Sequence, residues 1–338
     1  MMPESRKTSS CPVCSSDRLI TLYNFSAREA AQHFVCREGS PERSENLAVH
    51  IDALWGGSQC SVRECLNCEF GFSDPFVAGD MIFYNLAAER SFYGKERWEY
   101  IRTASELANA KFKADRVLEI GSGFGFFLDR IAGVHVAASG VTALEFGDRA
   151  VSELRKKGYV AIQEDVRAAK LKPGFDAIFM FQVLEHLDNV DALFSRLQSL
   201  LCPGGLFFAA VPNSRNIRFA ERNGSLLDMP PQHIGRWTES ALKMIGEHHG
   251  LHLERLEVEP FSLKDFIKTD VIYSYLRTAQ RVGTVANWSR SLRSARYGRL
   301  LGGATAAAYS PRRVNVWRKA AKARIGGALW AKYRKEAP

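Results

Sequence analysis

The residues with the clearest chemical capacity form a glycine-rich turn near the middle of the chain. Apolar residues 117–120 lead into the run Gly121-Ser-Gly-Phe-Gly125, which predicts a strand, a tight turn and the start of a helix. Glycines at such a turn let backbone N–H groups approach a ligand that a Cβ atom would exclude. A dinucleotide-binding loop would place its third glycine at Phe126 and would have no use for the acidic Glu119. A carboxylate there could instead bind an ammonium group.

Two histidines follow segments that should end at one edge of a parallel sheet. His186 comes five residues after the mainly apolar run 175–181, and His233 ends the run Pro230-Pro-Gln-His. Open α/β sheets bind ligands at the carboxyl ends of their strands, and histidine is the side chain best suited to accept a proton near neutral pH. We therefore predict that His233, or else His186, is a catalytic base. The alternatives are a capping or packing role for His186 and a loop-anchoring hydrogen bond for His233.

Four of the seven cysteines form two Cys-x-x-Cys pairs, Cys11 with Cys14 and Cys65 with Cys68. Two such pairs can offer four thiolates to a tetrahedral zinc ion, and the odd total argues against a full set of disulfides. The separation of the pairs exceeds the usual ribbon spacing, which an insertion that loops out would accommodate. A closed site of four thiolates would be structural, so no metal-assisted catalysis is expected from it.

These candidate groups are embedded in an alternation of short apolar runs and helical patterns that predicts an α/β fold with a mainly parallel sheet. Strands are expected at residues 116–120, 134–141, 160–163, 177–181, 206–211, 252–259 and 328–334, and helices at 125–131, 145–157, 190–201 and 239–249. Pro203-Gly-Gly205 should form the turn between a helix and the next strand.

In these motifs the chain resembles the class I S-adenosylmethionine (SAM)-dependent methyltransferases, in the branch of small-molecule enzymes with a Leu-Glu-His motif. The resemblance covers roughly residues 112–260 and rests on the glycine turn, Leu184-Glu-His186, the Pro-Gly-Gly turn and the run 230–238; residues 326–335 are similar to the final strand of that branch. It implies a doubly wound seven-stranded sheet. A zinc ribbon of similar outline to residues 1–75 also precedes some members of this branch.

The resemblance further implies SAM as cofactor, with the methionine part held by the glycine turn and Glu119, and with Asp165 near the adenine. The implied cofactor-binding residues are Glu119, Gly121, Ser122, Gly123, Gly125, Thr142, Glu145, Asp165 and Gln182. Family members usually carry an acidic residue at the end of the second strand, where this chain has Thr142. Either Glu145, from the next helix, binds the ribose hydroxyls in place of this acidic residue, or SAM binds more weakly, or the assignment of SAM as cofactor has to be revised.

The net charge of +9 is concentrated near the carboxyl terminus. Residues 266–338 contain 16 Lys and Arg against Asp270 and Glu336, which leaves a net −5 for the preceding part. Such a segment could contact anionic lipid, nucleic acid or an acidic substrate. No apolar run is long enough to span a membrane, and residues 1–10 lack the apolar core of a secretory signal, so a cytoplasmic location, possibly peripheral to the membrane, is expected.

The predicted organisation is a zinc-ribbon-like module (1–75), linking helices (76–111), a SAM-binding domain (112–264), a basic helical insertion (265–325) and a final strand and tail (326–338). The predicted function is methyl transfer to a small polar acceptor, such as a sugar or another biosynthetic intermediate. One alternative is an RNA methyltransferase that uses the zinc ribbon and basic region. Another is a non-catalytic membrane-peripheral protein with an amphipathic helix around Arg290–Leu301. The oligomeric state is left open.

Overall fold

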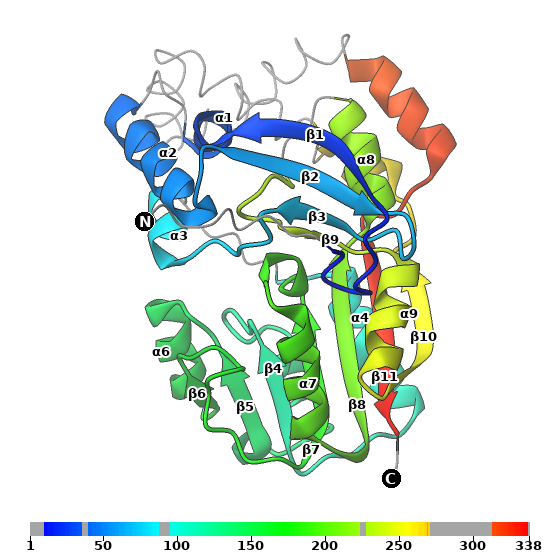
Figure 1. Ribbon diagram of the computed structural model, residues 1–338. Helices are drawn as coiled ribbons and strands as arrows, with labels where there is room; N and C mark the ends of the chain where they lie inside the picture. The colour runs from blue at the N-terminus through cyan, green and yellow to red at the C-terminus, as the bar shows by residue number, and fades with distance from the viewer. Residues whose placement is uncertain are drawn as a thin grey trace, which may run out of the picture.

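The computed structural model describes residues 10–35, 40–87, 95–223, 228–268, 270 and 313–336. Two β-sheets organise these residues (Figure 1). The larger sheet is covered by helices on both faces, and the smaller sheet lies across one end of it.

The larger sheet has seven strands in the order β10-β11-β8-β7-β4-β5-β6. Neighbours from β8 to β6 are parallel, whereas β11 runs antiparallel to both β8 and β10. This arrangement confirms the predicted doubly wound α/β sheet of seven strands. The strands are β4 (Val117–Ile120), β5 (Val141–Leu144), β6 (Val160–Ile162), β7 (Phe175–Phe181), β8 (Leu201–Pro212), β10 (Leu251–Val258) and β11 (Ala328–Lys335).

The alternation of side chains along β7 shows why helices pack on both faces. Ile178 and Met180 belong to the core under α7 (Val190–Leu200) and α9 (Glu239–His248), while Phe179 and Phe181 face the core under α4 (Trp98–Asn109), α5 (Leu128–Ile131) and α6 (Asp148–Lys156). Successive residues of a strand point to opposite faces, so an unbroken apolar strand has to be covered twice. The sheet is thereby sealed except at its edges and strand ends.

The smaller sheet is antiparallel, in the order β1-β2-β3-β9. Its strands are β1 (Leu19–Ser26), β2 (Gln59–Cys65), β3 (Gly71–Asp74) and β9 (Gly235–Arg236), and α1 (Ala27–Phe34) and α2 (Pro41–Trp55) lie between β1 and β2. These elements account for the long interval between the two cysteine pairs. Next come α3 (Met81–Ala87) and, after β8, α8 (Ser214–Arg222). The strand β9 begins two residues after His233. A segment that comes after β8 of the large sheet therefore completes the small sheet.

Several expected boundaries are wrong. The second strand of the large sheet is β5 at 141–144, not 134–141, because the chain turns at 132–136 and forms a short 3-10 helix at Ala138–Gly140. The helices expected at 125–131 and 145–157 are the shorter α5 and α6. The run Pro203-Gly-Gly205 lies within β8, in a register shift between Leu201 and Leu206, rather than in a turn before the strand.

Asp270 and Arg313, from the two ends of the basic region, lie together beside the carboxyl end of α8. Arg313 binds the carboxylate of Asp270 and donates a hydrogen bond to the carbonyl oxygen of Asn223 (2.8 Å), and Trp317 Nε1 also donates to Asp270 (2.8 Å). The residues expected to form an amphipathic helix, Arg290–Leu301, lie outside the described residues. Among the described helices, none is both long enough and apolar enough to cross a membrane.

Candidate active site and four-cysteine site

The glycine turn follows β4 at the carboxyl edge of the large sheet. Gly121, Gly123 and Gly125 all have positive φ angles (70°, 52° and 74°), a region that side chains with a Cβ atom rarely adopt. A Cβ atom on Gly121 would lie 2.3 Å from Cγ2 of Val183, in the segment after β7. Ser122 is buried, and its N–H group bonds the carbonyl oxygen of Leu144 (3.2 Å). Glycine is therefore required for the turn to pack against the neighbouring strand end.

Glu119 is buried two residues before this turn. Its side chain has one oxygen, Oε2, with neither solvent contact nor a hydrogen-bond partner. Burial, and then the negative charge of Glu145, raise the pKa of Glu119 well above its usual range. An unpaired buried carboxylate oxygen is costly unless a ligand supplies a donor or a positive charge. The geometry thus fits the ammonium group of the methionine part of SAM.

Glu145 lies directly after β5, so it occupies the strand-end position where the sequence analysis expected Thr142. Thr142 is in the middle of β5, between Leu118 and Val160 of the adjacent strands. One carboxylate oxygen of Glu145 accepts a hydrogen bond from the N–H group of Gly123 (2.7 Å), and the other accepts from Phe146 and Gly147. A carboxylate at this strand end is placed to accept hydrogen bonds from the hydroxyls of a ribose.

Two further residues expected near SAM occupy neighbouring strand ends. Asp165 follows β6, and both of its carboxylate oxygens bind Arg167 (2.8 and 2.7 Å). Burial acts to raise the pKa of Asp165, but the hydrogen bonds from Arg167 outweigh it and lower the pKa. Gln182 follows β7 with a φ of 57° and donates its backbone N–H to Ala210 (2.7 Å).

The structure brings His186 and His233 together at the end of β7. Their rings lie 4.6 Å apart, and Nδ1 of His233 is 2.8 Å from Oδ1 of Asp228. Nδ1 of His186 is 2.7 Å from the carbonyl oxygen of Gln232. A carbonyl oxygen and an ionised carboxylate can only accept, so each Nδ1 carries a proton, and in the neutral form of each ring Nε2 keeps a lone pair. Both rings are oriented as proton acceptors.

The pKa values of the two histidines are shifted in opposite directions. Burial, and then the positive charge of a protonated His233, lower the pKa of His186 to about 3. Burial also acts to lower the pKa of His233, but the hydrogen bond and charge of Asp228 outweigh it, and the pKa of His233 is raised. Burial raises the pKa of Glu185 to about 7. His233 is thus the stronger base of the pair.

A divalent cation is another group that this cluster could hold. One ligand atom from each of Glu185, His186 and His233 can be chosen so that all three lie within 4.8 Å of one another. Oε2 of Glu185 is buried without a hydrogen-bond partner. Two histidines and one carboxylate are a recognised ligand set for divalent metals. These three residues could therefore bind a divalent cation.

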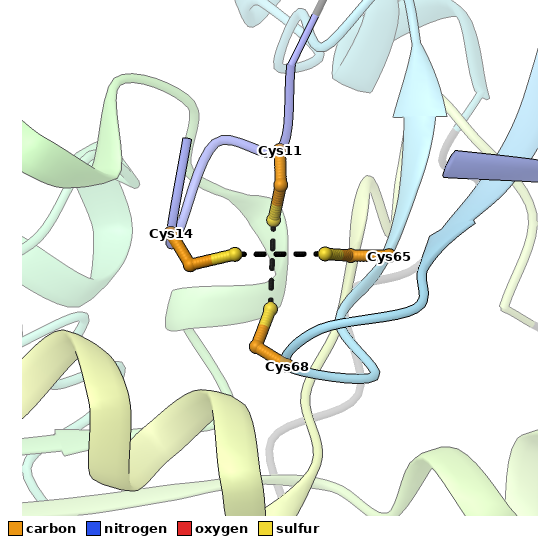
Figure 2. A group of neighbouring side chains, drawn as sticks. All are labelled: Cys11, Cys14, Cys65 and Cys68. Atoms are coloured by element: carbon orange, nitrogen blue, oxygen red, sulfur yellow. Dashed lines mark hydrogen bonds between the residues drawn. The ribbon is translucent and has the colours of Figure 1, made fainter. Parts of the chain in front are cut away.

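The four cysteines of the two Cys-x-x-Cys pairs converge on one point (Figure 2). Sγ of Cys11 lies 3.5 Å from Sγ of Cys68, and Sγ of Cys14 lies 3.5 Å from that of Cys65. A tetrahedral zinc ion with Zn–S bonds of about 2.3 Å would separate its sulfurs by about 3.8 Å. In each pair one thiol also accepts a backbone N–H, from Val13 and from Asn67 (both 3.4 Å). The donor set and its spacing fit a structural zinc ion.

Arg236, which ends β9, and Trp237, which follows it, make structural contacts. Trp237 is fully buried, with its ring 4.6 Å from that of Phe70. Arg236 is also buried and makes two hydrogen bonds to the carboxylate of Glu221 (2.9 and 2.6 Å) and one to Tyr23 Oη (2.6 Å). Two further cysteines of the described residues, Cys60 and Cys202, are free thiols outside the cluster, and Cys36 lies outside the described residues.

Three residues at the site were not identified from the sequence. Asp228 precedes His233 by five positions, and this spacing is the only local signal that could have revealed the pair. Tyr84 places its Oη 3.2 Å from Nδ1 of His186, from a helix about 100 residues away. The positive charge of Arg97 acts on both Glu119 and Glu185, where it partly offsets the effect of burial on their pKa values.

The chain is similar to known methyltransferases. Residues 93–256 match the model of a methyltransferase domain. A ubiquinone biosynthesis O-methyltransferase from Xanthomonas euvesicatoria is 29% identical over 191 residues, which cover 54% of this chain and 67% of that protein. A counterpart from Xanthomonas oryzae is 28% identical over 192 residues with the same coverage.

Two solved structures are similar at lower identity. The N-methyltransferase NodS from Bradyrhizobium japonicum, in complex with S-adenosyl-L-homocysteine, is 13% identical with a TM-score of 0.41, and the match covers 71% of this chain and 89% of that one. A Haemonchus contortus phosphoethanolamine N-methyltransferase is 14% identical with a TM-score of 0.43, covering 70% and 52%.

Proposed function

Since the chain is a SAM-dependent methyltransferase, we propose that it methylates a hydroxyl group of a small polar acceptor, with His233 as the base. The observation that carries this proposal is the Asp228–His233 pair, in a cluster with His186 at the strand end next to the glycine turn. The naming of the relatives as O-methyltransferases supports oxygen as the receiving atom.

The residues of the chain would divide the work as follows. Glu119 and the glycine turn hold the amino-acid end of SAM, and Glu145 accepts hydrogen bonds from its ribose. SAM supplies an electrophilic methyl group on a sulfonium, whose carbon–sulfur bond breaks as the new oxygen–carbon bond forms. His233 takes up the hydroxyl proton on Nε2, and Asp228 stabilises the imidazolium that results. His186, with its lowered pKa, stays neutral and can accept a hydrogen bond from the acceptor.

We further propose that Cys11, Cys14, Cys65 and Cys68 bind one zinc ion with a structural role. Four thiolates leave no open coordination position for a substrate. The readout is the metal content of the purified protein, where about one zinc per chain supports the site.

The cofactor assignment is tested by titration calorimetry with SAM and with S-adenosyl-L-homocysteine. Binding of both to the wild-type protein, with loss of binding in Gly123→Arg, supports the assignment of the turn, and unchanged affinity in that variant refutes it. The role of His233 is tested by His233→Ala on methyl transfer to a panel of hydroxylated acceptors. An unchanged rate contradicts the base, and stimulation of the wild-type enzyme by added Mg²⁺ or Mn²⁺ would assign the histidine cluster to a cation instead.

A second candidate is methylation of RNA, favoured by the basic region and the cysteine site together. Binding of RNA that weakens steeply with salt concentration would support it. The Asp228–His233 pair, which is suited to take a proton from a hydroxyl group, favours the small acceptor.

A further inference from the structure

The segment that carries His233 is held from two directions. Its strand β9 pairs with β3 of the small sheet, with Gly71 opposite Arg236, and Ser73 donates its N–H to the carbonyl oxygen of Ile234 (2.9 Å). On the other side, Ile234 donates its N–H to the carbonyl oxygen of Glu185, in the 3-10 helix Leu184–His186 that follows β7 of the large sheet (2.9 Å). The position of His233 therefore depends on the small sheet as well as on the domain that binds SAM.

The cysteine site lies at the end of this same segment. Thr238 Oγ1 donates a hydrogen bond to the carbonyl oxygen of Cys68 (3.0 Å) and accepts one from the N–H of Ala241 (3.1 Å), which caps α9. The side chain of Trp237 packs on Phe70, two residues after Cys68. The turn of the second cysteine pair thus makes direct contact with residues 237 and 238.

The glycine turn has its contacts elsewhere. Its hydrogen bonds outside the turn run to Leu144, Glu145, Asp129 and Lys157, and Gly121 packs against Val183. These partners belong to the large sheet and the segments that follow its strands, not to residues 10–75. A change at the cysteines should therefore affect the His233 segment more than the residues that bind SAM.

We propose that the metal held by the four cysteines positions residues 228–238, so that its loss loosens the His233 segment and leaves SAM binding intact. The inference rests on the zinc site proposed above. The metal would tie the first cysteine pair to the turn after β2, from which Cys68 and Phe70 reach Thr238 and Trp237. The zinc ion would then have a positioning role in methyl transfer without contacting substrate.

The test compares Cys14→Ser with Cys60→Ser. Cys14 is a partly exposed member of the four-cysteine cluster. Cys60 is a buried thiol of β2 outside that cluster, so Cys60→Ser controls for damage to the small sheet. Zinc content, affinity for S-adenosyl-L-homocysteine and hydrogen exchange of residues 228–238 are measured on the full chain. We expect Cys14→Ser to lose zinc, to bind the ligand within about twofold of wild type, and to exchange roughly tenfold faster in this segment.

A second pair of variants leaves every cysteine in place. Thr238→Asp keeps an acceptor for the α9 cap but cannot donate to Cys68, and Thr238→Ser keeps both functions. Exchange of residues 228–238 should rise about fivefold in Thr238→Asp, with zinc retained, and remain unchanged in Thr238→Ser.

Two results separate the possible failures. Loss of zinc in Cys14→Ser with unchanged exchange of residues 228–238 would overturn the inference while leaving the zinc site in place. Wild-type protein that contains no metal would overturn the zinc site itself, and the inference with it.

Discussion

Replacing Asp228 by Asn tests the proposed base most directly. The change keeps the size of the side chain but removes the charge that faces Nδ1 of His233 at 2.8 Å. A hydrogen bond to a charged group contributes about 1.5–3 kcal/mol, and each pKa unit corresponds to about 1.4 kcal/mol, so the pKa of His233 should fall by about 1–2 units. The amide can also donate to Nδ1, which would move the proton to Nε2 and block that atom as a base. We expect methyl transfer to fall about 100- to 10,000-fold.

The assay is kcat/KM as a function of pH with an acceptor identified by screening. His233 must be deprotonated to act, so the wild-type rate should rise with pH through the raised pKa of this residue. In Asp228→Asn the rise should move to lower pH. The pair formed by the exposed Asp191 and the largely buried His249, 3.3 Å apart, provides the control, and Asp191→Asn should leave the profile unchanged. A rate loss of less than about threefold in Asp228→Asn, with the profile in place, would refute the reasoning.

The same pair makes a prediction about stability. Because the folded-state pKa of His233 is raised, the stabilisation is fully present below its unfolded value of about 6.5 and is lost as the pH rises through the folded value. Asp228→Asn should therefore lower the free energy of unfolding more at pH 6 than at pH 9. Urea denaturation at both values measures the difference, and an equal loss at the two would contradict it.

Two further predictions concern the cofactor loop. Glu119→Gln keeps the size of the side chain but removes the carboxylate that would face the ammonium group of SAM, so SAM affinity should fall roughly 10- to 100-fold; calorimetry measures the change, and unchanged affinity would count against the ammonium contact. Gly121→Ala places a methyl group 2.3 Å from Val183 at a φ of 70°, whereas Gly133→Ala meets no atom within 4 Å at a φ of 75°. Both carry the backbone strain of about 1–2 kcal/mol, and only Gly121→Ala should also abolish SAM binding; equal effects would refute the steric argument.

The parts of the fold that the sequence predicted well are those encoded by local patterns. The segment before Gly121 and the run 175–181 both form central strands, because a short, mainly apolar segment bounded by turn residues is typical of a parallel strand. The strand expected at 134–141 is wrong because an apolar pattern also occurs here outside a strand. Its valines and alanines form an apolar stretch, but Val134 is 55% exposed and the chain turns back there. That error displaced the end of the second strand, which is why Glu145 was expected on a helix.

The candidate site was predictable only in part. Both histidines could be assigned to one sheet edge from the order of the motifs, and the structure brings them together. The partners that distinguish them could not be assigned, because Asp228 and Gln232 act through the shape of an irregular loop, and Tyr84 reaches His186 from a distant helix. The pairing of β9 with β3 is likewise non-local and leaves no periodic signal in two residues.

The two-residue strand β9 has a consequence for engineering. Because the segment around His233 completes the sheet built by the amino-terminal residues, exchanging that module between related enzymes would also require exchanging residues 228–238. A graft of one part without the other would leave an unmatched strand edge and displace the imidazole. Substrate preference and the cysteine module should therefore be inherited as a single unit.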